Sequence, residues 1–444
     1  MKSIACFAAL AFSLSAANAL AQQTPAAAQP ASGTSQGAPG TPPGAPERRE
    51  IPNDEIPRGQ TVMERPRPDY DPLGIRLGGF LLYPTFGVRQ LYTSNVYSTE
   101  RNTIDDFVTI AEPSVDLRSN WNNHSLTFHA DAAIGRYWNE TNENFEDFNI
   151  AAAGRLDITS LTQVFASLGY RWLHEERSSP DDVGGKKPTE YSITSASIGV
   201  QQRFNRLNFR VDGIIDRYNF RDTTAFGGGK IDQDDRDRDH LLLKLRGGYE
   251  FTPLREVYFL ANFNKRNYDQ ARDNAGFERD SYGVEVAAGL RYDLTGITFI
   301  DFFLGWSAQD YDDRRLKTAR GVSGGLSLSW NVTALTTITG KISREIEETT
   351  VNNSSAYFAT KAEVRVDHEL LRNLILTGYL SYQHDDFAGV SRDDDYFRVG
   401  ANGRYLFNRN FSTEAGYSFR TRQSNLANND FDEHLIMLRL VGRM

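Results

Sequence analysis

The sequence predicts an all-β protein: a transmembrane antiparallel up-and-down β-barrel of about 18 strands, preceded by a signal peptide and a disordered periplasmic tail. Three observations predict it. The chain begins with an export leader, apolar and polar residues alternate with a period of two from Gly79 to Met444, and tight turns alternate with longer loops between the alternating segments. No stretch after the leader reaches the run of about 18 apolar residues that a membrane helix needs, so a helical membrane protein is excluded.

The composition fits a barrel wall and excludes other classes. The 444 residues are only 39% hydrophobic, yet they include 20 Tyr, 27 Phe and 36 Gly, a combination that suits strands with one apolar and one wet face. The formal net charge of -9 argues against nucleic-acid binding. The single cysteine, Cys6, lies in the predicted leader, so we expect the exported chain to have no disulfide and no thiolate chemistry.

The start of the chain divides by composition. Lys2 precedes an apolar core, and Ala19-Leu20-Ala21 forms a small-residue cleavage site. An uncharged stretch rich in Ala, Pro, Gln and Gly follows, and then a charged stretch punctuated by proline, which resists helix and strand pairing and is too short for a plug domain. The predicted segments are a signal peptide (1–21), a low-complexity disordered tail (22–46), a periplasmic segment leading into the barrel (47–78) and the outer-membrane barrel (79–444).

Each predicted strand carries an apolar and a polar face in alternation, as a wall with one dry side requires. Examples of the apolar face are Leu241-Leu243-Leu245, Val284-Val286-Ala288, Val322-Leu326-Leu328 and Leu374-Leu376-Leu380, and examples of the polar face are Lys244-Arg246, Glu285-Arg291, Ser323-Ser327 and Thr377-Ser381. A soluble β-sandwich shows the same alternation with its apolar face inward, so the pattern alone does not identify the solvent.

Connection lengths favour a membrane barrel, because such barrels join their strands by short turns at one end and longer loops at the other. Tight turns are expected near Asn122, Ser160, Asn205, Pro253, Thr295, Thr333, Leu371 and Arg409. Longer loops are expected at 93–104, 139–144, 177–188, 221–237, 271–278, 312–318, 349–353, 387–394 and 425–429. An even number of strands would return both termini to the periplasm.

The tryptophans give a partly independent indication. Trp138, Trp172 and Trp306 lie toward predicted longer loops, whereas Trp121 and Trp330 lie toward tight turns. Aromatic residues gather at the two headgroup levels of a membrane barrel, whereas soluble β-domains bury Trp in mid-strand. The bacterial outer membrane, with its lipid and lipopolysaccharide, is therefore the expected environment.

Two motifs resemble active-site signatures by composition only. Gly321-Val322-Ser323-Gly324-Gly325 matches the G-x-S-x-G elbow, which requires a strand-to-helix turn, but it lies inside an alternating strand. Gly227-Gly228-Gly229-Lys230 lacks the spacing and the following hydroxyl residue of a phosphate loop. We expect small wall residues in the first case and a loop tip in the second, and therefore no catalytic residue and no cofactor.

Acidic runs and histidines are the remaining candidates for metal binding. The seven His show no metal-ligand spacing, and no acidic run matches a calcium loop, so we expect no metal site. Solvated loops explain the acidic runs, with cation bridging to lipopolysaccharide phosphate as the alternative. The runs are Asp181-Asp182, 232–239, Asp312-Asp313 and 393–395.

The polar face of the predicted wall supplies the candidate functional residues. If these charges pair across strands they stiffen the wall, and if they line water they form a charged channel; the two roles are compatible. Arginines exceed carboxylates among them, which predicts a positive field in the lumen. The pore-lining candidates are Arg155, Arg171, Arg203, Arg210, Arg246, Arg291, Arg398, Arg404, Arg420, Arg422, Arg439, Asp131, Asp212, Glu285, Asp301, Glu363 and Glu414.

Residues 67–80, Arg-Pro-Asp-Tyr-Asp-Pro-Leu-Gly-Ile-Arg-Leu-Gly-Gly-Phe, are followed by Leu82-Tyr83-Pro84 and later by Ser94-Asn95-Val96-Tyr97. This opening resembles that of a β-barrel porin family of Gram-negative bacteria, and the likeness extends from about Arg67 to Met444. The resemblance implies an association with exopolysaccharide export and implies no catalytic residue. The chain departs from usual barrels by ending without an aromatic residue, although 436–441 still alternates as a closing strand.

The leading hypothesis is a non-enzymatic pore that passes polar solutes and, from the resemblance, exopolysaccharide, with periplasmic export components as partners. One alternative is a non-conducting structural or adhesive barrel whose long loops bind surfaces. A second is an outer-membrane hydrolase, which needs Ser, His and a carboxylate or amide to converge; the sequence spacing indicates no such set.

Overall fold

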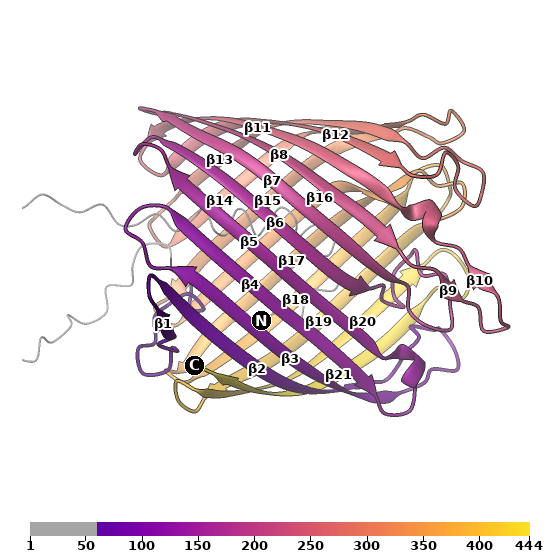
Figure 1. Cartoon of the computed structure of the whole chain (residues 1–444), viewed down its shortest axis with the longest axis horizontal. Coiled ribbons are helices and arrows are strands. Elements are labelled where there is room, and N and C mark those ends of the chain that lie inside the picture. Colours follow the sequence, from indigo (N-terminus) through magenta and orange to yellow (C-terminus); the bar gives the residue numbers. More distant parts are fainter. Residues whose placement is uncertain (1–59) are drawn as a thin grey trace, which may run out of the picture. The chain divides into compact units, whose positions relative to one another are not determined.

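The computed structural model describes residues 60–444, which form a closed barrel of 18 antiparallel strands (Figure 1). Each strand pairs with the next, and β2 pairs with β21 from Thr85↔Arg443 to Thr93↔Leu435, so the ring closes. The barrel strands are β2 (Phe80–Thr93), β3 (Asp106–Ser119), β4 (Ser125–Tyr137), β5 (Phe145–Asp157), β6 (Thr162–His174), β7 (Glu190–Phe204), β8 (Leu207–Phe220), β11 (Arg238–Thr252), β12 (Arg255–Tyr268), β13 (Ser281–Asp293), β14 (Thr298–Tyr311), β15 (Ala319–Thr333), β16 (Thr336–Glu348), β17 (Ala356–Leu371), β18 (Leu374–Phe387), β19 (Asp393–Leu406), β20 (Phe411–Ser424) and β21 (Phe431–Arg443).

Small elements complete the described chain: β1 (Ile75–Leu77), β9 (Thr223–Thr224), β10 (Lys230–Ile231), and the 3₁₀ turns η2 (Thr141–Glu143) and η3 (Asp234–Arg236). No helix in residues 60–444 is long and apolar enough to cross a membrane. The predicted signal peptide (1–21), the predicted tail (22–46) and residues 47–59 of the predicted leading segment lie outside the described residues.

The predicted connectivity is confirmed. Every expected tight turn and every expected longer loop separates two barrel strands. The short turns lie together at the left of Figure 1, with β1 and the C-terminus, and this end is called the turn end below. The longer loops lie at the opposite end, the loop end, with β9 and β10. The predicted closing strand is present as β21, which pairs with β2 on one side and with β20 on the other.

The apolar face of the strands points outward, as expected for a membrane barrel and not for a soluble sandwich. Leu243 on β11 and Val286 on β13 are among many large apolar side chains left exposed on the outer wall. Trp138 and Trp306 are exposed toward the loop end, and Trp330 toward the turn end. A closed wall of this kind suits lipid, because each barrel strand pairs with a strand on both of its sides.

Candidate functional site

The inner wall is lined by ion pairs between neighbouring strands or alternate residues. Arg246 donates two hydrogen bonds to Glu256, at 2.9 and 2.8 Å, the fork geometry that holds a guanidinium most firmly. Such pairs make the inner wall polar while their charges largely cancel locally. The others are Arg210–Asp212 (2.8 Å), Arg291–Asp301 (2.9 Å), Arg155–Asp157 (3.1 Å), Arg365–Asp367 (2.8 Å) and Arg404–Glu414 (3.5 Å).

The closing seam has its own pair of arginines. Glu112 of β3 accepts from Arg439 of β21 at 2.5 Å and lies 2.9 Å from Arg89 of β2. One carboxylate therefore ties together the first, second and last barrel strands. Arg89 and Arg439 face each other directly in the β2–β21 ladder, so Glu112 offsets the repulsion between two like charges at the closure.

The remaining candidates sit in separate parts of the wall. Asp131 contacts His129 at 2.5 Å and Asn149 at 3.1 Å, and Glu285 accepts from Asn262 at 2.7 Å. Other candidates are placed by ladder register alone: Arg171 lies opposite Asn149 and Ile193, Arg203 opposite Asn208, and Glu363 opposite Lys341 and Ser381. The structure thus brings the predicted set into one barrel but not into one cluster, and their role in solute passage stays a prediction.

Several inner-wall carboxylates were missed from the sequence. Glu112 follows a stretch of mixed polarity beside Pro113, and Glu256 is the second residue of β12, directly after a tight turn, where the alternation is hard to count. Asp157 and Asp367 lie near the turn end, and Glu433 near the loop end. Each of these carboxylates pairs with an arginine, so the excess of positive charge inferred from the sequence list is smaller than the list suggests.

Loop 175–189, between β6 and β7, folds into the loop-end mouth and reaches the far wall. Glu176 pairs with Arg420 of β20 at 3.1 Å, and Ser178 accepts from Arg422 through its carbonyl at 3.2 Å. Around the ring, β6 and β20 are six strands apart in a barrel of 18, where nine is diametrically opposite. The loop therefore crosses the mouth instead of standing above it.

The base of this crossing loop is fixed by buried arginines. Arg177 donates to both carboxylate oxygens of Glu143, at 2.9 and 2.6 Å, and also reaches Asp182 at 3.2 Å. Arg236 forks onto Glu175 with hydrogen bonds of 3.0 and 2.9 Å. All of these side chains except Asp182 are buried, so the loop is held by desolvated charge pairs.

The β16–β17 hairpin also enters the barrel. Pairing of β15 with β16 stops at Gly324↔Arg344, although β15 continues to Ala319 and β16 to Glu348. Beyond that point Phe358 packs on Ala319 and its ring lies against Gly321. The hairpin tip, residues 345–358, is thus tucked inside the wall of β12–β15.

Polar contacts hold the tucked tip in place. Glu348 accepts from the hydroxyls of Tyr268 at 2.7 Å and Tyr311 at 2.8 Å and pairs with Arg266. The loop that follows meets the crossing loop, since Asp181 accepts from the Thr349 hydroxyl at 2.7 Å. The tucked tip and loop 175–189 together cover the loop-end mouth.

At the turn end, residues 60–73 run along the inner rim from β15 to β21. Val62, fully buried, donates its backbone N–H to the Thr337 hydroxyl at 2.8 Å. Arg67 pairs with Glu369 at 2.8 Å, and both side chains are buried. Arg443 donates to the Tyr70 carbonyl at 3.0 Å. This rim segment therefore lies against the inner side of the turn end, although its sequence shows no period that predicts the path.

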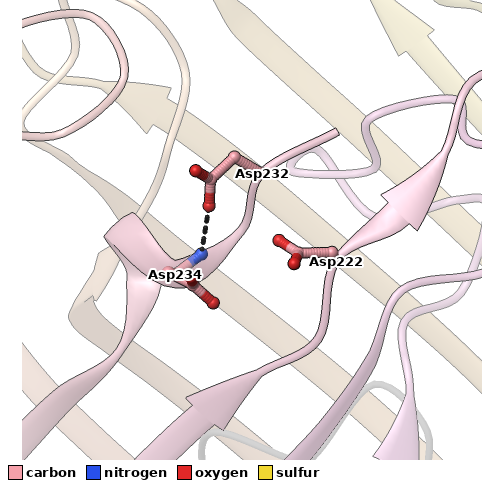
Figure 2. A group of neighbouring side chains, drawn as sticks. All are labelled: Asp222, Asp232 and Asp234. Carbon is pink, nitrogen blue, oxygen red and sulfur yellow. Dashed lines mark hydrogen bonds between the residues drawn. The ribbon is translucent and has the colours of Figure 1, made fainter. Parts of the chain in front are cut away.

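Three exposed or half-buried carboxylates meet in the β8–β11 loop: Asp222, Asp232 and Asp234 (Figure 2). Asp222 pairs with Lys230 at 2.6 Å, and Asp232 accepts from the Asp234 backbone N–H at 3.0 Å. These contacts explain the arrangement as a hydrogen-bonded turn, so we assign no metal site. The 227–230 motif lies at the tip of the same loop.

Ser323, at the centre of the G-x-S-x-G match, is 1% exposed and lies within β15. The strand continues on both sides of it to Ala319 and Thr333. The exposed strand-to-helix elbow that would make this serine a nucleophile is therefore not formed there.

The chain is similar over most of its length to solved Pseudomonas structures. Pseudomonas aeruginosa OpdO is 14% identical, with 82% of this chain and 97% of that chain covered at a TM-score of 0.44. P. aeruginosa OccK2 (OpdF) is 12% identical, with coverages of 82% and 98% and a TM-score of 0.45. A BenF-like porin from Pseudomonas fluorescens Pf-5 is 12% identical, with coverages of 82% and 99% and a TM-score of 0.44. No curated protein sequence matches the chain.

One family model covers the barrel and part of the rim segment. The family described as "Putative beta-barrel porin 2" matches residues 67–444, from Arg67 of the rim segment to the last residue. The match extends over the range in which the outward apolar face, the charged inner wall and the closing seam all lie. The chain therefore belongs to this family of outer-membrane β-barrel porins.

Proposed function

We propose that this porin-family barrel is a non-enzymatic, gated conduit for polar solutes, oriented with its turn end and both termini in the periplasm. The observation that carries the proposal is the inner wall, where charged side chains from strand after strand face the interior as pairs. Barrels of about 8 strands are filled by their own side chains, whereas barrels of about 16 to 18 strands leave room for an aqueous channel. Paired charges with water around them let a polar solute exchange one weak contact for the next.

We propose that the transported solute is exopolysaccharide and that the barrel acts together with periplasmic export components. The support is the sequence resemblance to a family associated with that export, together with guanidinium groups stacked on aromatic rings inside the barrel. Arg246 lies 4.1 Å from the Tyr258 ring centroid, and Arg238 lies 4.3 Å from that of Tyr218. Flat apolar surfaces beside fixed hydrogen-bond donors suit sugar rings, which carry one apolar face and a hydroxyl rim.

The test combines conductance and transport. Purified protein in planar bilayers should show single-channel currents, and liposomes containing it should swell in small sugars and less in larger ones. A strain lacking the protein should retain less surface polysaccharide, and re-expression should restore it. If currents occur but surface polysaccharide is normal, the pore stands and the polysaccharide cargo is wrong.

A structural, non-conducting barrel is the second candidate, and the crossing of the loop-end mouth by loop 175–189 favours it. In that case no current should appear, even after loop 175–189 is shortened to a turn. Esterase and peptidase assays on the same preparation test the hydrolase alternative, for which the position of Ser323 gives no support.

A further inference from the structure

The β16–β17 tip has the alternation of a lipid-facing strand pair, but it lies inside the barrel. On β16, Ile342 is exposed on the outer face, and Ile346 is four residues further on and therefore has the same outward parity. On β17, Val364 is exposed on the outer face and Phe358 shares its parity. Ile346 and Phe358 are also direct partners in the β16–β17 ladder. The tip thus carries an apolar pair where a lipid-facing wall would need one.

In the tucked position this outward face lies on an inward face. Phe358 forms a buried cluster with Ala319 of the inner face of β15, and Ile346 and Tyr311 of β14 pack against this cluster. Glu348, of the same parity, reaches Arg266 and Tyr311 inside the barrel. The tip has therefore swung inward as a unit, with its own β16–β17 ladder intact to Glu348↔Ala356.

The inward position of the tip leaves unsatisfied polar groups on and beside β15. Residues 319–323 have no ladder partner on the β16 side, and the wall is open to that extent. The hydroxyls of Ser323 and Ser307, near Gly321 on the inner face, are buried without a hydrogen-bond partner among residues 60–444. Unpaired edge groups and buried hydroxyls each oppose the tucked position.

The ladder itself defines the other position. Continuing the β15–β16 register beyond Gly324↔Arg344 places Val322 opposite Ile346 and Arg320 opposite Glu348. In that register Ile346 and Phe358 would join Val322 on the lipid face, and the β15 edge would be paired. The inner space now occupied by the tip would be vacated.

We propose that the β16–β17 tip is a gate with two positions, tucked as in this structure and zipped onto β15, and that zipping opens the loop-end mouth. The inference rests on the proposed pore function and names the element that regulates it. The contact of Asp181 with Thr349 links the gate to loop 175–189, so the two covers of the mouth release together.

Two engineered disulfides should trap the two positions in the full-length chain. Val322→Cys with Ile346→Cys joins residues that are opposite only when the tip is zipped, and Asp181→Cys with Thr349→Cys joins side chains that meet only when it is tucked. Leu326→Cys with Ile342→Cys is the matched control. That pair is already opposite in the ladder, faces outward, and has the same phase as the zipped pair four residues away. The only native cysteine is Cys6, so the background is low.

Each variant is oxidised in membranes, its disulfide yield is measured by mass spectrometry of the linked peptides, and its conductance is compared before and after reduction. We expect all three pairs to form. The zipped pair should raise conductance severalfold, the tucked pair should lower it, and the control should leave it unchanged. The gate is overturned if the control pair oxidises while the zipped pair stays reduced, or if both locked forms conduct alike. If no form conducts, the pore proposal fails, while the yield of the zipped disulfide still reports whether the tip moves.

Discussion

Glu176, in the loop after β6, forms an ion pair with Arg420 of β20 across the barrel mouth, at 3.1 Å. Arg420 also pairs with Glu433 of the neighbouring strand, so the arginine is held by its own wall before the loop reaches it. The wall thus presents a fixed cation, and loop 175–189 docks on it with a carboxylate. Docking of this kind is reversible, because undocking leaves Arg420 with a partner.

Glu176→Gln should loosen the crossing loop without unfolding the barrel. The substitution removes a charged hydrogen bond, worth roughly 1.5 to 3 kcal/mol of docking free energy, while Arg420 keeps Glu433. Mean conductance should rise and its fluctuations should increase in bilayer recordings. Glu146→Gln is the control, because Glu146 pairs with Arg136 on an exposed rim, where such pairs contribute little. An unchanged conductance in Glu176→Gln would show that the loop does not limit the current.

Docking of the same loop should depend on pH. Burial raises the pKa of Asp182 to about 6, against the opposing effect of Arg177. Above about pH 4 the Asp182 carboxyl is ionised in a free loop but still protonated in the docked loop. Docking is therefore linked to uptake of a proton by Asp182. It is strongest near pH 4 to 5 and weakens as the pH rises through 6. At lower pH it weakens again. Burial alone would raise the pKa of Glu176, but Arg420 and Arg398 outweigh it and hold the pKa below its usual value, so protonation of Glu176 removes the ion pair.

Conductance should therefore increase from pH 5 to pH 7 with a midpoint near 6. Asp182→Asn should flatten this rise and keep the loop docked at pH 7, since the amide cannot ionise. A rise of equal size in wild type and Asp182→Asn would assign the titration to another group.

A charge introduced on the outer face of the wall should destabilise the barrel much more than one introduced on the inner face. Leu243→Arg or Leu326→Arg places a guanidinium against lipid and should lower the free energy of unfolding by about 2 to 4 kcal/mol. Ser327→Arg, one residue along on the inner face, should be mild. Urea titrations of protein folded into liposomes measure both. Equal losses at the two sites would mean that the faces are wrongly assigned.

How much the sequence could predict depended on whether a feature repeats along the chain. Alternation and turn residues predicted the strands, their connections and the outward face, because each strand obeys the same rule. The path of Glu176 to Arg420 could not be predicted, since it depends on a contact between residues 244 positions apart. The β16–β17 tip shows the opposite case, in which the alternation predicts the wrong position. Ile346 and Phe358 follow the wall rule, but contacts with Ala319 and Arg266 made by their hairpin override it.

The inner-wall pairs were predicted in part, for a similar reason. Alternation identified Arg246 and Arg404 as inward, but only the ladder register shows which carboxylate each one meets. The path of the rim segment could not be predicted from the sequence. Pro66 and Pro68 interrupt any helical or strand periodicity there, and the segment is held by single hydrogen bonds to distant strands.

Arg67→Ala should release the rim segment from the turn end. The change leaves Glu369 buried and short of its nearest partner, which typically costs about 3 to 5 kcal/mol. Hydrogen–deuterium exchange of residues 60–73 should accelerate, whereas exchange in β17 should not. Arg372→Ala is the control, because Arg372 lies 3.7 Å from the same carboxylate with most of its side chain exposed. Equal protection in wild type and Arg67→Ala would show that other contacts hold the rim segment in place.

Ion selectivity should follow the sign of whichever partner is left unpaired in the lumen. Arg246→Gln leaves Glu256 without its fork, and Arg404→Gln leaves Glu414 without the arginine 3.5 Å away, so each change adds a net negative charge to the wall. Combined with Arg171→Gln, these substitutions should shift the reversal potential in a KCl gradient toward cation preference. Glu256→Gln should shift it in the opposite direction, because it leaves Arg246 uncompensated. Arg136→Gln, on the exposed rim pair, should leave the potential unchanged. If the inner substitutions of both signs leave the reversal potential of a conducting protein unaltered, ions do not pass these residues, and the current must take a path outside the charged lumen.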